Sequence, residues 1–185
     1  MATETETADK IERLKRMIIC HADLQTSLSA ITFLNNEASE DEVYDYVELR
    51  RLKCYETAFV ISYGRAFTKS NGSRHKQLSL KQIGLRLSKE DQALHDRIIS
   101  ARSKKYAHSD MASAHTRIDT HMIDVKGKDF PIYHIQWDEG LDFIGGLEPF
   151  EVMDLISKIM DHLHVVTQDL VDELKDHLPI YITPE

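Results

Sequence analysis

The chain has 185 residues, of which 42% are hydrophobic, and a formal net charge of −8. This length suits a single domain, and the composition is close to the globular average, which favours a folded chain over a disordered one. No apolar run approaches the roughly 18 residues of a membrane span, and the acidic N-terminus is unlike a signal peptide. We therefore expect a cytoplasmic protein with no membrane association. The negative net charge also argues against a general nucleic-acid coat.

The two cysteines, Cys20 and Cys54, are predicted to be free thiols. Without an export signal they have no route to an oxidising compartment, and two cysteines make no disulfide framework. Both fall on apolar-leaning faces of predicted helices, so we expect them to be buried.

The charge is distributed unevenly along the chain. Residues 65–108 contain eleven Lys or Arg and three acidic residues, which leaves 12 basic and 28 acidic residues elsewhere. This segment therefore carries +8 and the remainder −16. A positive field of this kind could attract an anion, or the basic residues could pair with acidic helices of the same fold or of a second subunit. Both interpretations stay open at this point.

The first half of the chain predicts two long helices. Residues 1–8 are expected to form a disordered tail. From Asp9 the apolar residues recur with the 3.6-residue period of an amphipathic helix, which ends near Asn36. Ser39 followed by Glu42 is the pattern of a capping box, and it predicts a second helix from Ser39 to about Thr68. The apolar positions of the first helix are Ile11, Leu14, Met17, Ile18, Leu24, Leu28, Ile31 and Leu34.

The second half predicts a short helix, a third long helix, a β-hairpin and a last helix. Ser79 with Gln82 forms a second capping-box pattern, and Ser88 with Asp91 caps the third long helix, which runs to around His108. Segments 117–125 and 130–137 alternate in polarity, contain β-branched and aromatic residues, and flank Lys-Gly-Lys-Asp, which predicts a hairpin. The last helix is the clearest, and it is stopped by Pro179. Its apolar positions are Val152, Leu155, Ile156, Ile159, Leu163, Val166, Leu170 and Leu174.

The predicted fold is therefore all-α. It is an up-and-down bundle of four long helices, with a small β-hairpin at about 117–137 inserted between the third and fourth helices. Residues 9–185 are expected to form one domain.

The most informative motif is Arg102 followed six positions later by His108, at the C-terminal end of the third predicted helix. This arrangement resembles the HEPN superfamily, small four-helix domains whose signature is an Arg and a His separated by four to six residues. Ser103 stands where that family often has a polar residue. The flanking sequence is similar to the branch found in bacterial abortive-infection systems, and the resemblance extends to Arg65 in the segment FVISYGRAFT. By motif it spans about residues 55–111.

The resemblance implies a metal-independent endoribonuclease acting in phage defence or a stress response. Under this endoribonuclease hypothesis, Arg102 and His108 are the catalytic candidates. His108 would transfer a proton to or from a ribose hydroxyl, because imidazole titrates near neutral pH. Arg102 would hold the phosphate and stabilise its growing charge. No metal or cofactor is expected. The candidates for substrate binding are Ser103, Lys105, Tyr106, Asp110 and Arg65.

Helical geometry limits how Arg102 and His108 can act together. Six positions at 100° each place them about 120° apart on a straight helix. They converge if the helix end unwinds, if Arg102 reaches around, or if two copies meet across a two-fold axis. The third route resembles the composite site of HEPN domains, and so a homodimer is predicted.

The rival hypothesis is a non-catalytic helical bundle that binds a nucleotide, an RNA or an unknown protein partner through its basic segment. In that case Arg102 would pair with Asp96, with Glu56 or with the last carbonyls of its helix. Lys105 and His108 would then simply interact favourably with the helix dipole.

Overall fold

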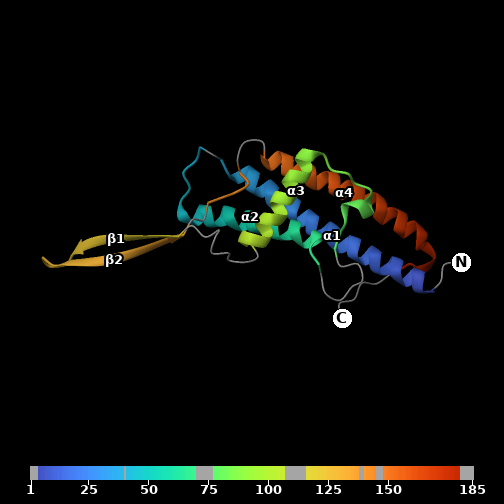
Figure 1. The fold of residues 1–185 in the computed structure, drawn as a ribbon, viewed down its shortest axis with the longest axis horizontal. Helices are drawn as coiled ribbons and strands as arrows, with labels where there is room; N and C mark the ends of the chain where they lie inside the picture. The colour runs from blue at the N-terminus through green and yellow to red at the C-terminus, as the bar shows by residue number, and fades with distance from the viewer. Residues whose placement is uncertain are drawn as a thin grey trace.

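The structure is a computed structural model, and it describes residues 4–39, 41–69, 77–106, 116–137, 140–144 and 148–179. It contains four α-helices and, between the third and the fourth, one antiparallel β-hairpin (Figure 1). The predicted fold, an all-α bundle with an inserted hairpin, is confirmed. The helices are α1 (Glu4–Glu37), α2 (Tyr46–Phe67), α3 (Lys89–Ala101) and α4 (Glu148–Glu173), and the strands are β1 (Thr116–Asp124) and β2 (Asp129–Trp137).

The bundle is organised around α1, which packs along both α2 and α4. The shorter α3 crosses the bundle obliquely and contacts α2 and α4 more locally (Figure 1). Each long helix has an apolar stripe at helical spacing, and burying these stripes against one another forms the core. The fully buried side chains include Leu24, Ile31 and Leu34 of α1, Phe59, Val60 and Tyr63 of α2, and Leu155, Ile156 and Ile159 of α4.

Helix α1 begins earlier than the sequence predicted. It starts at Glu4 rather than Asp9, so residues 4–8 of the expected disordered tail are helical. Acidic residues in the first turn favour the positive end of the helix dipole. In addition, Lys10 forms ion pairs with Glu6 one turn away and with Glu173 of α4, which hold this end of α1 against the bundle.

Helix α2 begins later than predicted, because a different capping box is used. Its N-cap is Asp45, whose carboxylate accepts hydrogen bonds from the backbone N–H groups of Val47 and Glu48, while Glu48 reaches back to the Asp45 N–H. The capping box predicted at Ser39 is therefore wrong. Val43 is 96% exposed, so extending the helix toward Ser39 would bury nothing. The predicted end near Thr68 is confirmed, since Thr68 is the C-cap.

Of the two serine caps predicted in this part of the chain, Ser88 and Ser79, only one is observed. Ser88 is confirmed as the N-cap, and its Oγ accepts from the Asp91 N–H at 3.0 Å. The short helix predicted after Ser79 is a 3-10 turn, Leu80–Ile83, and Ser79 makes no side-chain cap. Gly84 ends this turn in the left-handed conformation, with φ of +69°, which glycine adopts without strain.

The hairpin is joined by a two-residue turn, Lys126-Gly127. Val125 and Lys128 exchange backbone hydrogen bonds, and both turn residues have positive φ, as a type I′ turn requires. The Asp124 carboxylate accepts from the Gly127 N–H at 3.0 Å and closes the turn. The hairpin projects away from the helices (Figure 1).

The cysteine prediction holds for one residue and fails for the other. Cys20 is fully buried, and burial raises the pKa of its thiol to about 11. Cys54 is exposed. It lies two positions from both Leu52 and Glu56, about 200° around α2 from the buried stripe, and so faces outward.

Contrary to the expectation from the sequence, one 18-residue stretch of α1 is long and apolar enough to cross a membrane by length and composition alone. The core helix of a soluble protein meets the same criterion. Here α1 buries Leu24, Ile31 and Leu34 against other helices of the bundle.

Candidate functional site

The predicted site lies where α3 stops being an α-helix. After Ala101 the chain forms a π-helical turn, Arg102–Tyr106, and the Arg102 N–H is shared between the carbonyls of Ile98 and Ile99. Ile98 is the buried residue that holds this end of α3 on the bundle. π-helical turns are rare and are found frequently at functional sites. One way for Arg102 and His108 to converge is a departure of the helix from α-geometry. In the structure that departure begins at Arg102 itself.

The side chain of Arg102 packs into a notch on α2 formed by Gly64. A Cβ atom added to Gly64 would lie 2.6 Å from Cγ of Arg102 and 3.1 Å from its Cδ. Real Cβ atoms do not approach this closely, so the aliphatic part of Arg102 occupies space that only glycine leaves open. The position of Arg102 is thus set by packing.

The charged end of Arg102 has no acidic partner among the described residues. Its Nε is buried without a hydrogen-bond partner there. The two carboxylates considered from the sequence have other partners: Asp96 accepts from Gln92, and Glu56 accepts from Lys53 and Tyr106. Within the described chain, the guanidinium charge is left for a group outside the protein or for a residue beyond the described ranges.

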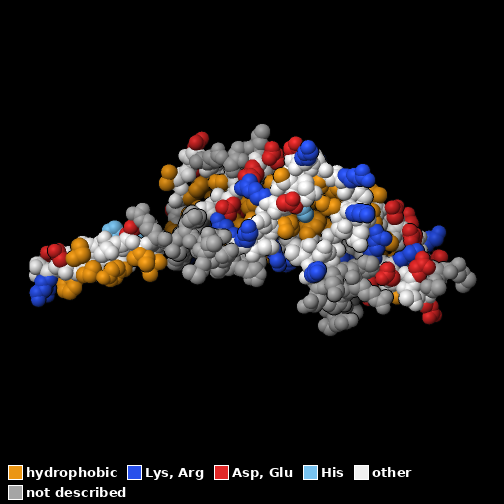
Figure 2. Space-filling model, in the orientation of Figure 1, with side chains coloured by type: hydrophobic (Ala, Val, Ile, Leu, Met, Phe, Trp, Pro, Cys, Tyr) orange, Lys and Arg blue, Asp and Glu red, His pale blue; other side chains and the backbone are white. Residues whose placement is uncertain are grey.

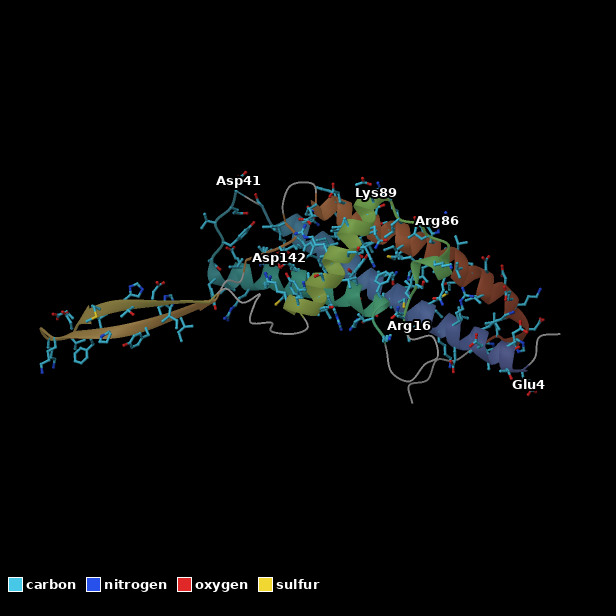
Figure 3. All side chains as sticks on the ribbon, in the orientation of Figure 1. Glu4, Arg16, Asp41, Arg86, Lys89 and Asp142 are labelled. Carbon is cyan, nitrogen blue, oxygen red and sulfur yellow. The ribbon has the colours of Figure 1, made fainter. Side chains whose placement is uncertain are left out.

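Lys105 and Tyr106, by contrast, are tied into the fold. The Lys105 Nζ contacts both carboxylate oxygens of Asp142, at 2.9 and 2.8 Å. The Tyr106 hydroxyl lies 2.5 Å from Oε2 of Glu56 and 2.8 Å from Oδ2 of Asp142. Figure 3 labels Asp142 beside α2, where the chain after the hairpin returns to the bundle. These contacts connect the π-helical turn to α2 and to the segment 140–144.

Glu56 is the centre of this network and is completely buried. Its Oε1 accepts from the backbone N–H groups of Asp142 and Phe143, the latter at 2.9 Å, and its Oε2 accepts from Lys53 at 2.6 Å. Lys53 uses its other two donors on the Gly140 carbonyl at 2.8 Å and the Tyr106 hydroxyl at 3.0 Å. A buried carboxylate is costly unless it is paired and hydrogen-bonded, and here both requirements are met.

The network shifts the pKa values of two of its own members, Tyr106 and Asp142. Burial, together with the neighbouring Glu56 charge, raises the pKa of Tyr106 far above its ordinary value, so the hydroxyl stays protonated. Burial alone would raise the pKa of Asp142, but hydrogen bonds from Lys105 and Tyr106 outweigh it and lower that pKa. Asp142 is therefore an anion paired with Lys105, which makes this cluster a structural clasp.

A second polar contact between α2 and α3 lies two helical turns before Arg102. The Tyr63 hydroxyl is 2.7 Å from Nδ1 of His95, and the His95 ring also packs edge-on against Phe67. Burial raises the pKa of the Tyr63 hydroxyl and lowers the pKa of His95. His95 is seven residues before Arg102, so the two lie on nearly the same face of α3.

The remaining predicted site residues are dispersed. Arg65 forms an ion pair with Asp23 of α1, and Ser103 is exposed on the π-helical turn. His108 and Asp110 lie outside the described residues. The structure therefore brings Lys105 and Tyr106 together in one cluster and gives Arg65 a different partner. Arg102 is half-buried against α2, and Ser103 is exposed.

Three basic residues of the segment 65–108 form ion pairs within the described fold. Arg97 pairs with Glu148 of α4 and Lys105 pairs with Asp142, in addition to the Arg65–Asp23 pair. Of the two interpretations of the charge segregation, pairing with acidic partners holds for these three residues. Arg102 differs from these three, because its stem packs against Gly64 while its charge has no acidic partner among the described residues.

An open hollow of about 660 Å³ lies along the outer face of α2. The lining residues are spaced at helical intervals along one face of α2. Its lining is mostly apolar and small, with two basic residues. It is formed by Arg50, Lys53, Cys54, Thr57, Ala58 and Ile61.

Sequence reasoning missed Gly64 and His95, and it named Glu56 only as a possible partner of Arg102. A signal for Glu56 was present, because it is a charged residue on the same helical stripe as Leu52, Phe59 and Tyr63. For Gly64 and His95 no local signal existed, since their roles depend on which helix crosses α2.

Comparison of the chain with models of protein families, with curated proteins and with solved structures found no match. Within the described residues, no group of three or more His, Cys, Asp or Glu side chains is placed to hold a metal ion.

Proposed function

We propose that this chain is a metal-independent endoribonuclease of the HEPN type, acting as a cytoplasmic homodimer in phage defence or a stress response. One observation carries the proposal, which is the placement of Arg102. It stands at the start of a π-helical turn, its stem is held by the Gly64 notch, and its charge has no acidic partner among the described residues. A guanidinium positioned by packing is prepared to bind a phosphate.

In this proposal Arg102 holds the scissile phosphate and stabilises the charge that develops on it. His108, six residues further on, transfers a proton to or from the ribose hydroxyl or the leaving oxygen. Ser103, exposed beside Arg102, orients the substrate. Lys105 and Tyr106 act indirectly, because their contacts with Asp142 and Glu56 hold the π-helical turn in place.

The test compares RNA cleavage by the wild type, Arg102→Gln and His108→Ala on a mixed single-stranded RNA pool in EDTA. Arg102→Gln keeps most of the aliphatic stem in the Gly64 notch and removes the charge. Each substitution should lower the cleavage rate by about 10²-fold or more, with little change in melting temperature. Arg97→Gln is the matched control, since it removes an arginine from the same helix that is paired with Glu148.

Cleavage by the Arg97→Gln protein should therefore persist. An inactive wild type, or cleavage that survives both Arg102→Gln and His108→Ala, would refute the nuclease proposal.

The hollow on α2 favours a second candidate function, a non-catalytic bundle that binds a nucleotide, an RNA or a protein partner. Its apolar lining lies beside Arg50, whose side chain is exposed, a pattern that suits an amphipathic ligand. In that case the wild type would bind RNA or a partner without turnover. Ile61→Arg, which fills the hollow with charge, would weaken that binding while Arg102→Gln would not.

A further inference from the structure

The hairpin presents an apolar face that the bundle does not cover. Ile118, Met122, Tyr133 and Ile135 lie on the same face, and each is at least 59% exposed. In Figure 2 this face is a continuous hydrophobic strip along the projecting hairpin. Each strand of the hairpin packs mainly against the other strand. A two-stranded hairpin alone is at best marginally stable in water, and further strands are what such a hairpin needs.

The two free edges of the hairpin differ in their capacity to accept another strand. Val125 and Lys128 exchange hydrogen bonds, and bonded and non-bonded pairs alternate along an antiparallel ladder. The Met122–Pro131 pair is therefore non-bonded, and the backbone groups of both residues point outward. Because proline has no N–H, Pro131 interrupts the donors along the β2 edge, as edge-protecting prolines do.

The β1 edge carries no such interruption. By the same alternation, the backbone N–H and C=O groups of Ile118, Thr120 and Met122 point outward from β1. This edge can accept a further antiparallel strand.

The charges of the hairpin favour a second copy of itself as that strand. Residues 116–137 contain three Lys or Arg (Arg117, Lys126, Lys128) and three Asp (Asp119, Asp124, Asp129), so the hairpin is neutral although the chain carries −8. Two hairpins can therefore approach each other without the repulsion that the whole molecules experience.

The charges also select a register. If two β1 strands pair about an axis at Thr120, Asp119 lies opposite His121 of the other copy, and this favourable pair occurs twice. Moving the axis to residue 119 places two Asp119 side chains opposite each other, and moving it to 121 places two His121 side chains together. Two carboxylates directly opposite each other are unfavourable, whereas an imidazole N–H opposite a carboxylate can donate a hydrogen bond to it.

We propose that β1 pairs antiparallel with β1 of a second copy of this chain, about a two-fold axis at Thr120. The product is a four-stranded sheet in which Ile118 of each copy lies opposite Met122 of the other, so that two exposed apolar side chains cover each other. This interface goes beyond the proposed nuclease, because it involves neither Arg102 nor His108.

Disulfide trapping tests this register in the full chain, in a Cys54→Ser background that removes the exposed native thiol. In the proposed dimer the two Thr120 Cα atoms are about 5.5 Å apart, which a disulfide can span. The two Ile118 Cα atoms are offset by four residues, or about 13 Å. With diamide as oxidant at micromolar protein, Thr120→Cys should form a covalent dimer and Ile118→Cys should not.

Two prolines then distinguish the edges. Met122→Pro in the Thr120→Cys protein removes an outward donor from β1 and should abolish the cross-link, whereas Tyr133→Pro acts on the β2 edge and should leave it. Absence of cross-linking at Thr120, equal cross-linking at both cysteine positions, or equal effects of the two prolines would overturn the proposal. Because the readout is independent of RNA cleavage, the hairpin interface and the nuclease can fail separately.

Discussion

Replacing Gly64 by alanine examines whether the position of Arg102 is set by the notch on α2. In an ordinary helix this change is stabilising by about 0.5–1 kcal/mol, because glycine loses more backbone entropy than alanine. Here the new Cβ would lie 2.6 Å from Cγ of Arg102. Cγ is near the start of the side chain, so Arg102 can only avoid the contact by changing rotamer or by displacing the end of α3.

The size of the effect follows from two opposing contributions. Overpacking a filled site costs about 1–3 kcal/mol, and the helix gain offsets about 0.5–1 of it. Gly64→Ala should therefore be destabilising by up to about 2.5 kcal/mol when Arg102 is present. In an Arg102→Ala background the Cγ and Cδ atoms are gone, and the same change should be neutral or stabilising by up to about 1 kcal/mol.

Urea unfolding followed by circular dichroism, performed on the four proteins of this cycle, measures the difference directly. The coupling free energy between Gly64 and Arg102 should be about 1–3 kcal/mol. RNA cleavage by Gly64→Ala should also fall, because Arg102 is displaced. If Gly64→Ala changes the unfolding free energy equally in both backgrounds, Arg102 does not occupy the notch and the reasoning is wrong.

Three further predictions concern the fold. Glu56→Gln removes the central charge of the buried network and should lower the unfolding free energy by about 3–5 kcal/mol, whereas exposed Glu42→Gln should stay within about 0.5. Asp45→Ala should cost about 1 kcal/mol as a lost N-cap, while Ser39→Ala should have little effect, and the reverse order would contradict the observed start of α2. Because burial lowers the pKa of His95, its contribution to stability is complete above about pH 6.5 and is lost as the pH falls through its folded pKa. His95→Phe should therefore lose less stability than the wild type between about pH 6.5 and 5 in denaturant titrations, and an identical loss would show that His95 is not buried in its neutral form.

The local pattern was sufficient for most of the fold. The apolar period of α1 and α4, the Ser88 cap of α3 and the alternating segments around Lys126-Gly127 each specify an element from a few neighbouring residues. Where two local signals competed, as at Ser39 and Asp45, the pattern could not choose. The structure uses the later box, in which the Asp45 carboxylate accepts from the Val47 and Glu48 N–H groups and Glu48 reaches back to the Asp45 N–H.

The same distinction between local sequence pattern and tertiary packing applies to the candidate site. From the sequence alone, the Arg102 and His108 motif, the all-α bundle with its hairpin insert and the uneven charge could be recognised, because each is a property of residues close together in the chain. Only the tertiary structure decided what the neighbours of Arg102 do. Lys105 and Tyr106 were candidates for substrate binding, yet they contact Asp142 and Glu56, which are 36 to 50 residues away. A charged side chain binds whichever opposite charge the packing of distant helices brings within reach, and that choice is not encoded at its own position.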